Sequence, residues 1–328
     1  MKRLILIAAL LILSITAIAC SSGGSAGAVN PPALDTGIDP EAWVSIPAGE
    51  FPYGMHDHMT QVDEYEIMVT DVTVEQYARF LNEALAAGAI SVGAVDVDAG
   101  YNVEDDELVA PRTVEGVHGF YPGDRYDGYK HEMQILEGEK LYIPLNSDGI
   151  RISFNGTEFT YQPEYANHPM TMVSWYGANA YCQYYDWRLP RDAEWEKAAR
   201  GTEVDAEGHG RPFPWGEEIM PNNANYYSSF DLFEKISDKL GNTTPVGFYN
   251  GKTYEGYETL DSPSPYGLYD MAGNVWQWVG DDFPNIHYRY MRGGSYYSYE
   301  VDLRVWKINT AGPEHYAPDT GFRCARDH

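Results

Sequence analysis

The chain of 328 residues contains few cysteines and few basic residues. Three cysteines without C-x-x-C spacing are too few for a disulfide scaffold and do not match a zinc site. The 22 Lys and Arg against 49 Asp and Glu give a net charge of −27, which argues against phosphate-backbone binding, so nucleic acid is not an expected partner. Aromatic residues are abundant, with 27 Tyr and 8 Trp. A chain this long and aromatic can bury a core, which excludes a disordered acidic tail.

Residues 1–19 have the plan of a secretory signal peptide, because Lys2 and Arg3 precede an uncharged apolar run that is short for a spanning helix. Small residues then lead to Cys20, as in a bacterial lipoprotein lipobox, although Ala17 stands where Leu is more usual. We expect export and lipidation of Cys20. Ordinary signal cleavage nearby and an uncleaved anchor are the alternatives. The expected location is therefore extracytoplasmic, as a cell-envelope lipoprotein.

Residues 20–40 are rich in Ser, Gly, Ala and Pro and are predicted to form a flexible tether behind the lipid. Ser21, and not Asp, follows the cysteine, which by resemblance to known sorting favours the outer membrane if the source has one. An acidic domain is repelled by anionic headgroups, so the lipid would hold it at the membrane. Residues 41–328 show no repeat and no second linker. They are predicted to form one domain with an insertion at about 86–165.

Local patterns predict few regular elements. Residues 43–51 alternate apolar and polar side chains, as in a strand or hairpin. Thr73 and Gln76 form a capping-box pattern at the start of a helix. A second helix is predicted over 175–185. The insertion is Gly-, Asp- and Tyr-rich without helical period, which predicts loops and short strands over the surface.

A third helix is predicted to begin near Asp192 and to end before Gly201. Glu194 and Glu196 in its first turn could suggest an acid and base pair. Residues two apart on a helix point in different directions, so we expect a capped and solvated first turn instead.

Eleven short blocks follow one another along the domain. In order they are Ile46-Pro-Ala-Gly49, Asp71-Val-Thr73, His168-Pro169, Val173-Ser-Trp175, Ala180-Tyr-Cys182, Arg188-Leu-Pro190, Glu194-Trp-Glu196, Phe213-Pro-Trp-Gly216, Gly267-Leu-Tyr-Asp-Met-Ala-Gly-Asn-Val-Trp276, Arg292-Gly-Gly-Ser295 and Gly321-Phe-Arg-Cys324. This order resembles the formylglycine-generating enzyme, or sulfatase-modifying factor, family. The resemblance implies an irregular α+β domain related to C-type lectin domains, with little regular secondary structure.

The resemblance fails at two positions of the active site. Catalytic members of the family have two cysteines that hold copper and activate oxygen, and the matching residues here are Ser298 and Leu303. Neither a hydroxyl nor an isobutyl group can act as a thiolate ligand for Cu(I). We therefore expect no copper, no catalytic residue and no formylglycine formation by thiolate chemistry.

Iron remains an open alternative, since some relatives are non-haem iron enzymes. The three-histidine site of the sulfoxide synthases among them needs a helical domain that has no counterpart here. His56 and His58 could co-ligate a metal because alternate strand residues face one side, but no third ligand is identifiable. We expect them to be surface histidines.

The resemblance also implies structural calcium sites and a disulfide. Oxygen ligands suit this hard ion, and the alternative at each site is a hydrogen-bonded loop. The first set is Asn225 and Asp238 by side chain with Tyr226 and Leu240 by carbonyl; the second is Asp270 and Gln277 by side chain with Gly273 and Val275 by carbonyl. Gln277 stands where the family often has Glu. Cys182 and Cys324 match a disulfide of some members that joins the middle helix to the C-terminal strand, and two buried free thiols are the alternative.

The predicted function is that of a binding or structural module. By resemblance, the groove that accepts a peptide in the enzymes lies over the Gly-Gly-Ser block. The candidate groove residues are Trp276, Ser295, Tyr296, Tyr297, Ser298 and Tyr299. Tyrosines give stiff amphipathic contact area for an exported protein, a peptide or a glycan, although they could equally fill the core. The alternative is a divergent oxidoreductase of the family, using iron or another metal on exported proteins. The ligand and the oligomeric state stay open.

Overall fold

The computed structural model describes residues 31–97, 101–102, 107–108, 112–124, 135–234, 242–282 and 288–327. The predicted signal peptide and Cys20 lie outside the described residues, as does most of the predicted tether. The helices are α1 (Val74–Ala86), α2 (Trp175–Tyr184) and α3 (Asp192–Arg200), with the 3₁₀ turns η1 (Pro163–Tyr165) and η2 (Glu300–Asp302). In the part of the chain that is described, no helix combines the length and apolarity needed to cross a membrane.

The described strands are short and numerous. They are β1 (Trp43–Ile46), β2 (Gly49–Tyr53), β3 (His58–Val62), β4 (Tyr65–Met68), β5 (Ser91–Val97), β6 (Tyr101–Asn102), β7 (Glu107–Leu108), β8 (Arg112–Tyr121), β9 (Gly138–Pro144), β10 (Ile152–Phe154), β11 (Phe159–Tyr161), β12 (Thr253–Tyr254), β13 (Tyr257–Glu258), β14 (Trp276–Asp282), β15 (Arg289–Arg292), β16 (Ile308–Ala311), β17 (Thr320–Phe322) and β18 (Ala325–Arg326).

The helices begin where local capping chemistry predicts. Thr73 accepts a hydrogen bond from the backbone N–H of Gln76, and the Gln76 side chain accepts one from the N–H of Thr73. Helix α3 begins at Asp192 and ends before Gly201, which has a φ of 78° that favours glycine. Helix α2 lies within the predicted range 175–185. The three predicted helices are confirmed. Their ends could be predicted because capping contacts lie within one helical turn.

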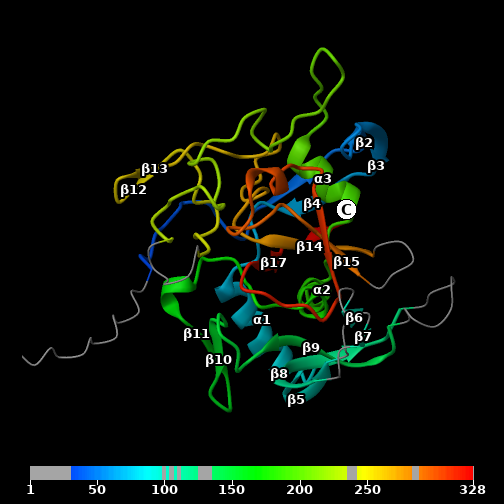
Figure 1. Ribbon diagram of the computed structural model, residues 1–328. Helices are drawn as coiled ribbons and strands as arrows, with labels where there is room; N and C mark the ends of the chain where they lie inside the picture. Colours follow the sequence, from blue (N-terminus) through cyan, green and yellow to red (C-terminus); the bar gives the residue numbers. More distant parts are fainter. Residues whose placement is uncertain are drawn as a thin grey trace, which may run out of the picture.

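The central sheet has the order β16-β15-β14-β17, and its strands β14 and β17 run parallel. Figure 1 shows α3 on one side of this sheet and α1 with α2 on the other. The sequence predicts a strand or a hairpin over residues 43–51; strands form there, but the two strands do not pair as a hairpin. Strand β1 pairs with β4, whereas β2 pairs with β3, so the two neighbouring strands enter different sheets.

The expectation of surface loops and short strands over 86–165 is also wrong in part. Strands β5, β8 and β9 form an antiparallel sheet that packs against α2 (Figure 1). Val117 and Ile143 from this sheet are fully buried in the largest core cluster. Gly116 is needed there because a Cβ atom at this position would clash with the carbonyl oxygen of Ile143. A glycine that indicates a loop in sequence therefore serves close strand packing.

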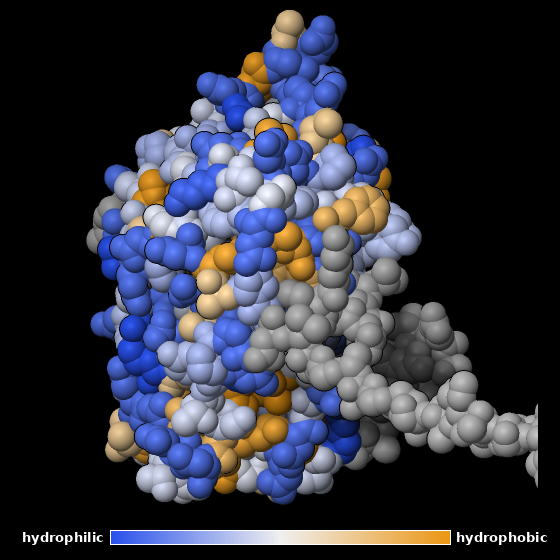
Figure 2. Space-filling view, turned by 90° about the vertical axis from the view of Figure 1, so that its left-hand side faces the viewer, coloured by the Kyte–Doolittle hydropathy of each residue, from blue (hydrophilic) through white to orange (hydrophobic). Residues whose placement is uncertain are grey.

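The largest core cluster joins α1, α2 and the C-terminal strands, and it contains a disulfide. Cys182 of α2 is bonded to Cys324, between β17 and β18, with a Cα separation of 5.7 Å. Tyr77 and Tyr181 stack next to this bond, and Phe322 meets both rings edge-on. On the face seen in Figure 2, hydrophilic residues predominate and hydrophobic ones occur in separate patches, as expected for so acidic a chain.

Candidate functional site

A cavity of about 340 Å³ opens beside the Gly-Gly-Ser block. It is lined by Trp276, Ser295, Tyr297, Ser298, Asp302, Lys307, Ile308, Asn309 and Asp319. Four of the six predicted groove residues therefore meet in one place. Asp319, which lies in the loop before β17, was not among the predicted groove residues.

The floor of this cavity is a turn held by hydroxyl groups. Gly293 and Gly294 have φ of 92° and 74° and turn the chain after β15. The N–H of Ser295 donates to Oγ of Ser298 at 3.0 Å, and Oγ of Ser295 donates to the Asp319 carboxylate at 2.7 Å. The Ser298 hydroxyl is thus engaged as an acceptor within the turn.

Leu303 lies below the cavity and does not line it. Its side chain is fully buried at the end of η2, in an apolar cluster with Phe213 and Tyr226. A Cβ on Gly294 would lie only 2.9 Å from Cδ1 of Leu303, so the turn closes directly over this side chain. The two positions at which the family's enzymes carry cysteine hold a hydrogen-bonded hydroxyl and an apolar packing group.

The tyrosines that follow the block divide between core and surface. Tyr296 is buried, and its hydroxyl donates to the carbonyl of Pro318 at 3.3 Å. Tyr297 and Tyr299 are 40% and 59% exposed, and the Tyr299 ring packs on Tyr227 with centroids 4.8 Å apart. Tyr296 lines a second, neighbouring cavity, whereas Tyr299 lines neither of these two cavities. The tyrosines were predicted to line a groove or to fill the core, and each prediction is correct for some of them.

The second predicted calcium set is closed by hydrogen bonds. Oε1 of Gln277 accepts from Nε1 of Trp195 and from Nε of Arg323, both at 2.8 Å. Its Nε2 donates to the carbonyl of Asp270 at 2.7 Å. Both lone pairs of the Gln277 oxygen are used. In this arrangement the Gln277 oxygen has no lone pair left for a cation, so Gln277 does not fit the role of a calcium ligand.

Arg323 supplies the positive charge at this position. Besides Gln277, its guanidinium donates to the carbonyls of Met68, Val69 and Tyr269 and to the carboxylate of Asp71. All of its donors are used although the side chain is fully buried. Sequence comparison marks Arg323 as part of a family block but does not predict its contacts, which come from distant segments.

Two buried carboxyl groups flank this arginine. Burial raises the pKa of Asp71 to about 8 and that of Asp270 to about 6, and the Arg323 guanidinium opposes both shifts. Asp71 is the carboxyl group in direct contact with Arg323, at 3.2 Å, and burial favours its protonated form.

The first predicted calcium set contains a buried oxygen that is not engaged by a described hydrogen-bond donor. Nδ2 of Asn225 donates to the carbonyl of Asn242 at 2.7 Å and to Oδ1 of Asn274 at 3.3 Å, which fixes the orientation of the amide. Oδ1 of Asn225 is buried, and among the described residues it has no hydrogen-bond partner. A buried amide oxygen in need of a partner fits a calcium ligand. Tyr226 is adjacent, whereas Asp238 and Leu240 lie outside the described residues.

The sulfatase-modifying factor enzyme 1-like domain family matches residues 32–328, almost the whole chain. The chain belongs to this family. Formylglycine-generating enzyme from Bos taurus is 32% identical over 328 residues, covering 88% of this chain and 75% of that protein. The enzyme from Mus musculus is 28% identical, covering 91% and 79%.

Other relatives share only this domain. Serine/threonine-protein kinase pkn1 of Chlamydia caviae is 34% identical over 209 residues, which cover 58% of this chain but 29% of the kinase. The chain thus spans less than a third of the length of that relative. The solved structures of CarF and of PvdO from Pseudomonas aeruginosa each match 87% of this chain with a TM-score of 0.51, at 20% and 19% identity. They confirm the expected irregular α+β fold of the family.

The environment of the family block Glu194-Trp-Glu196 differs from the one that the sequence predicted. Glu194 and Glu196 are buried, so the prediction of a solvated first turn is wrong. Glu194 accepts two hydrogen bonds from Arg188 at 2.6 and 2.9 Å, and Glu196 lies 3.1 Å from Arg292 and 3.2 Å from Arg200. Arg188 and Arg292 from outside the helix, together with Arg200 within it, make this burial possible. The two carboxylates bind different partners, as their helical spacing predicts.

The histidines expected at the surface are exposed. The rings of His56 and His58 lie 6.2 Å apart in the loop before β3 and at its start. Asp57 between them has a positive φ and binds Arg200 and His209, so the segment is not a regular strand there. In the described ranges no group of three or more His, Cys, Asp or Glu residues could hold a metal.

Proposed function

We propose that this chain is an exported, membrane-anchored ligand-binding domain of the family, without formylglycine-generating activity. The observation that carries the proposal is the chemistry at Ser298 and Leu303. Ser298 offers a hydroxyl that already accepts a hydrogen bond, and Leu303 is packed in an apolar cluster. Neither can provide the thiolate that copper chemistry requires. The similarity to a Bos taurus relative named inactive C-alpha-formylglycine-generating enzyme 2, 32% identical over 165 residues, supports this proposal.

The cavity next to Ser298 supports a binding role. Trp276 and Tyr297 offer aromatic surface, and Asn309 and Asp319 offer polar groups along the same cavity. Aromatic faces with a few polar groups suit an exported peptide or a glycan. Membrane attachment would come from lipid on Cys20, at the outer membrane where the source has one. The disulfide Cys182–Cys324 suits the oxidising compartment that this location implies.

For cofactors, we propose one structural calcium ion and no copper. The ion would bind at Asn225, Tyr226, Asp238 and Leu240, where the unpartnered Oδ1 of Asn225 is the supporting observation. At the second position the guanidinium of Arg323 takes the place of a metal ion.

The test is an activity and metal assay on the purified protein. A sulfatase-derived peptide with its cysteine is incubated under air with copper and reductant, with an active family enzyme as the positive control. Mass spectrometry follows conversion of cysteine to formylglycine. We expect no conversion and no stoichiometric copper or iron. Conversion, or one copper per chain, would contradict the proposal, and one iron per chain would favour the oxidoreductase alternative.

A further inference from the structure

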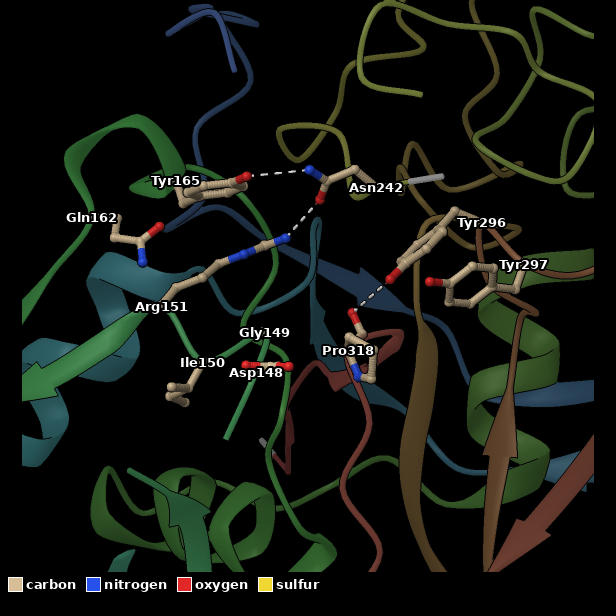
Figure 3. Close-up of a pocket in the computed structure, with 10 residues that line it drawn as sticks. All are labelled: Asp148, Gly149, Ile150, Arg151, Gln162, Tyr165, Asn242, Tyr296, Tyr297 and Pro318. Carbon is tan, nitrogen blue, oxygen red and sulfur yellow. Dashed lines mark hydrogen bonds between the residues drawn. The ribbon is translucent and has the colours of Figure 1, made fainter. Parts of the chain in front are cut away.

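A second cavity, of about 310 Å³, adjoins the first and shares Tyr297 with it. Figure 3 shows that its walls come from separate stretches of chain, including Pro318 near the C-terminus. Residues 148–151, Gln162 and Tyr165 belong to the segment 86–165, whereas Asn242 and Tyr296 come from later loops. The segment that sequence analysis left without a role therefore builds one side of this cavity.

Arg151 is the distinctive group of this cavity. Its guanidinium lies over the ring of Tyr165 at 4.0 Å, and Nη2 donates to Oδ1 of Asn242 at 2.9 Å (Figure 3). Nη1 is enclosed and has no hydrogen-bond partner among the described residues. Within these ranges Arg151 forms no ion pair. This is unusual in a chain where 49 acidic residues face 22 basic ones.

The charge of this arginine persists under ordinary conditions. Burial lowers the pKa of Arg151 to about 10, and nearby tyrosines, not carboxylates, oppose the shift. The side chain therefore stays cationic at neutral pH without a counter-ion in the described part of the chain. A buried charge without a partner is unfavourable, so an entering carboxylate would complete this site.

The other groups around the cavity restrict the ligand further. Tyr297 presents a partly exposed ring on which a flat apolar face can stack. Asp148 accepts hydrogen bonds and Gln162 both donates and accepts, so a ligand with hydroxyl groups as well as a carboxylate can use both exposed side chains. An acidic amino-acid side chain would make no hydroxyl contact with these two groups.

We propose that this cavity binds a hexuronate, the carboxylate-bearing sugar of an acidic glycan, with its carboxylate on Arg151 and its ring against Tyr297. The volume suits a single sugar ring. The inference rests on the proposed binding function and names a ligand class for the surface that adjoins the groove.

The test is calorimetric titration of the purified protein. The probes are the methyl glycosides of glucuronate, galacturonate and mannuronate, the matching neutral methyl hexosides, and N-acetylglutamate amide. We expect saturable binding of at least one uronide, at least tenfold tighter than its neutral counterpart. Arg151→Gln should remove that difference, whereas Arg79→Gln, on the surface of α1, should preserve it. Gln162→Ala and Tyr297→Ala, at exposed side chains, should each weaken uronide binding at least threefold, which keeps the test valid if Arg151→Gln does not fold.

Three results would overturn the inference: no saturable uronide binding, undiminished binding in folded Arg151→Gln or in both Gln162→Ala and Tyr297→Ala, or tighter binding of the glutamate probe. The formylglycine assay separates this failure from failure of the proposed function. Absent uronide binding with no peptide conversion rejects the hexuronate site alone. Peptide conversion rejects the proposed function whatever the titrations show.

Discussion

The two predicted calcium positions contain similar oxygen-bearing residues, yet their surroundings are opposite. At the second position Gln277 and Asp71 both accept hydrogen bonds from Arg323, a cation that belongs to the protein itself. At the first position the buried Oδ1 of Asn225 has no partner in the described structure. At one position the acceptor oxygens of Gln277 and Asp71 are engaged by a protein cation, and at the other a buried oxygen lacks a hydrogen-bond partner among the described residues.

The difference shows that a ligand pattern in sequence specifies acceptors but not the donors that reach them. Arg323 is 46 residues from Gln277 and 252 from Asp71 along the chain. Whether an oxygen is available to a metal depends on such remote groups. A family motif can therefore persist while its metal is replaced by a side chain.

The largest effect is expected from removing the internal cation. Arg323→Met would leave Asp71, Gln277 and three carbonyl groups without their donor, and we expect a loss of about 3 to 5 kcal/mol in the free energy of unfolding. Urea titration measures it. Arg79→Met at the surface should change stability by less than about 1 kcal/mol. If added calcium restored the stability of Arg323→Met, the second position would be a calcium site after all.

A slightly smaller effect is expected from the disulfide, because Cys324 is next to Arg323 and anchors it to α2. Replacing Cys182 and Cys324 by Ala together should lower the free energy of unfolding by about 2 to 5 kcal/mol. Reductant should lower the melting temperature of the wild type but not of this double variant. An equal response to reductant in both proteins would show that the bond does not stabilise the fold.

Calcium removal should have a moderate effect that maps to the first position alone. A ligand at 100 times its Kd stabilises by about 2.7 kcal/mol, so a chelator should lower the melting temperature measurably. Asn225→Ala should abolish the response to calcium, and Asp270→Asn should retain it. A response that survives in Asn225→Ala and disappears in Asp270→Asn would reverse the assignment of the two positions.

The effect of pH at the second position is expected to be the smallest when it is measured over one pH unit. The pKa of Asp71 is raised by burial to about 8, so the folded state holds a proton that the unfolded chain releases above about pH 4. This contribution to stability is complete below pH 4 and is lost as pH rises through about 8. Between pH 6 and 7 it changes by up to about 1.4 kcal/mol. Asp71→Asn keeps an acceptor for Arg323 and should show a flatter profile by thermal unfolding; equally steep profiles would contradict the assignment.

Prediction from sequence succeeded where the determining contacts are local or where a motif is strongly specific. Thr73 and Gln76 cap a helix within one turn, and the ordered blocks identified the family and its fold. Prediction failed for the segment 86–165, which was expected to be surface loops, because its glycines permit close strand packing. It also failed for Glu196, which was expected to be solvated, because one of its arginine partners comes from β15. Burial of a charged or small residue depends on what packs against it, which no short window contains.

Composition and motif by themselves determined the family, the irregular α+β fold, and the replacement of two cysteines by Ser298 and Leu303. Only the tertiary structure decided that Arg323 donates to Gln277 and Asp71 at one predicted metal position. It also decided that, among the described residues, Asn225 Oδ1 has no partner at the other position and Arg151 has no counter-ion beside its cavity. The physical reason is the same in each case. The state of a buried polar group is set by the donors, acceptors and charges within hydrogen-bonding distance, and the fold brings these from remote parts of the chain.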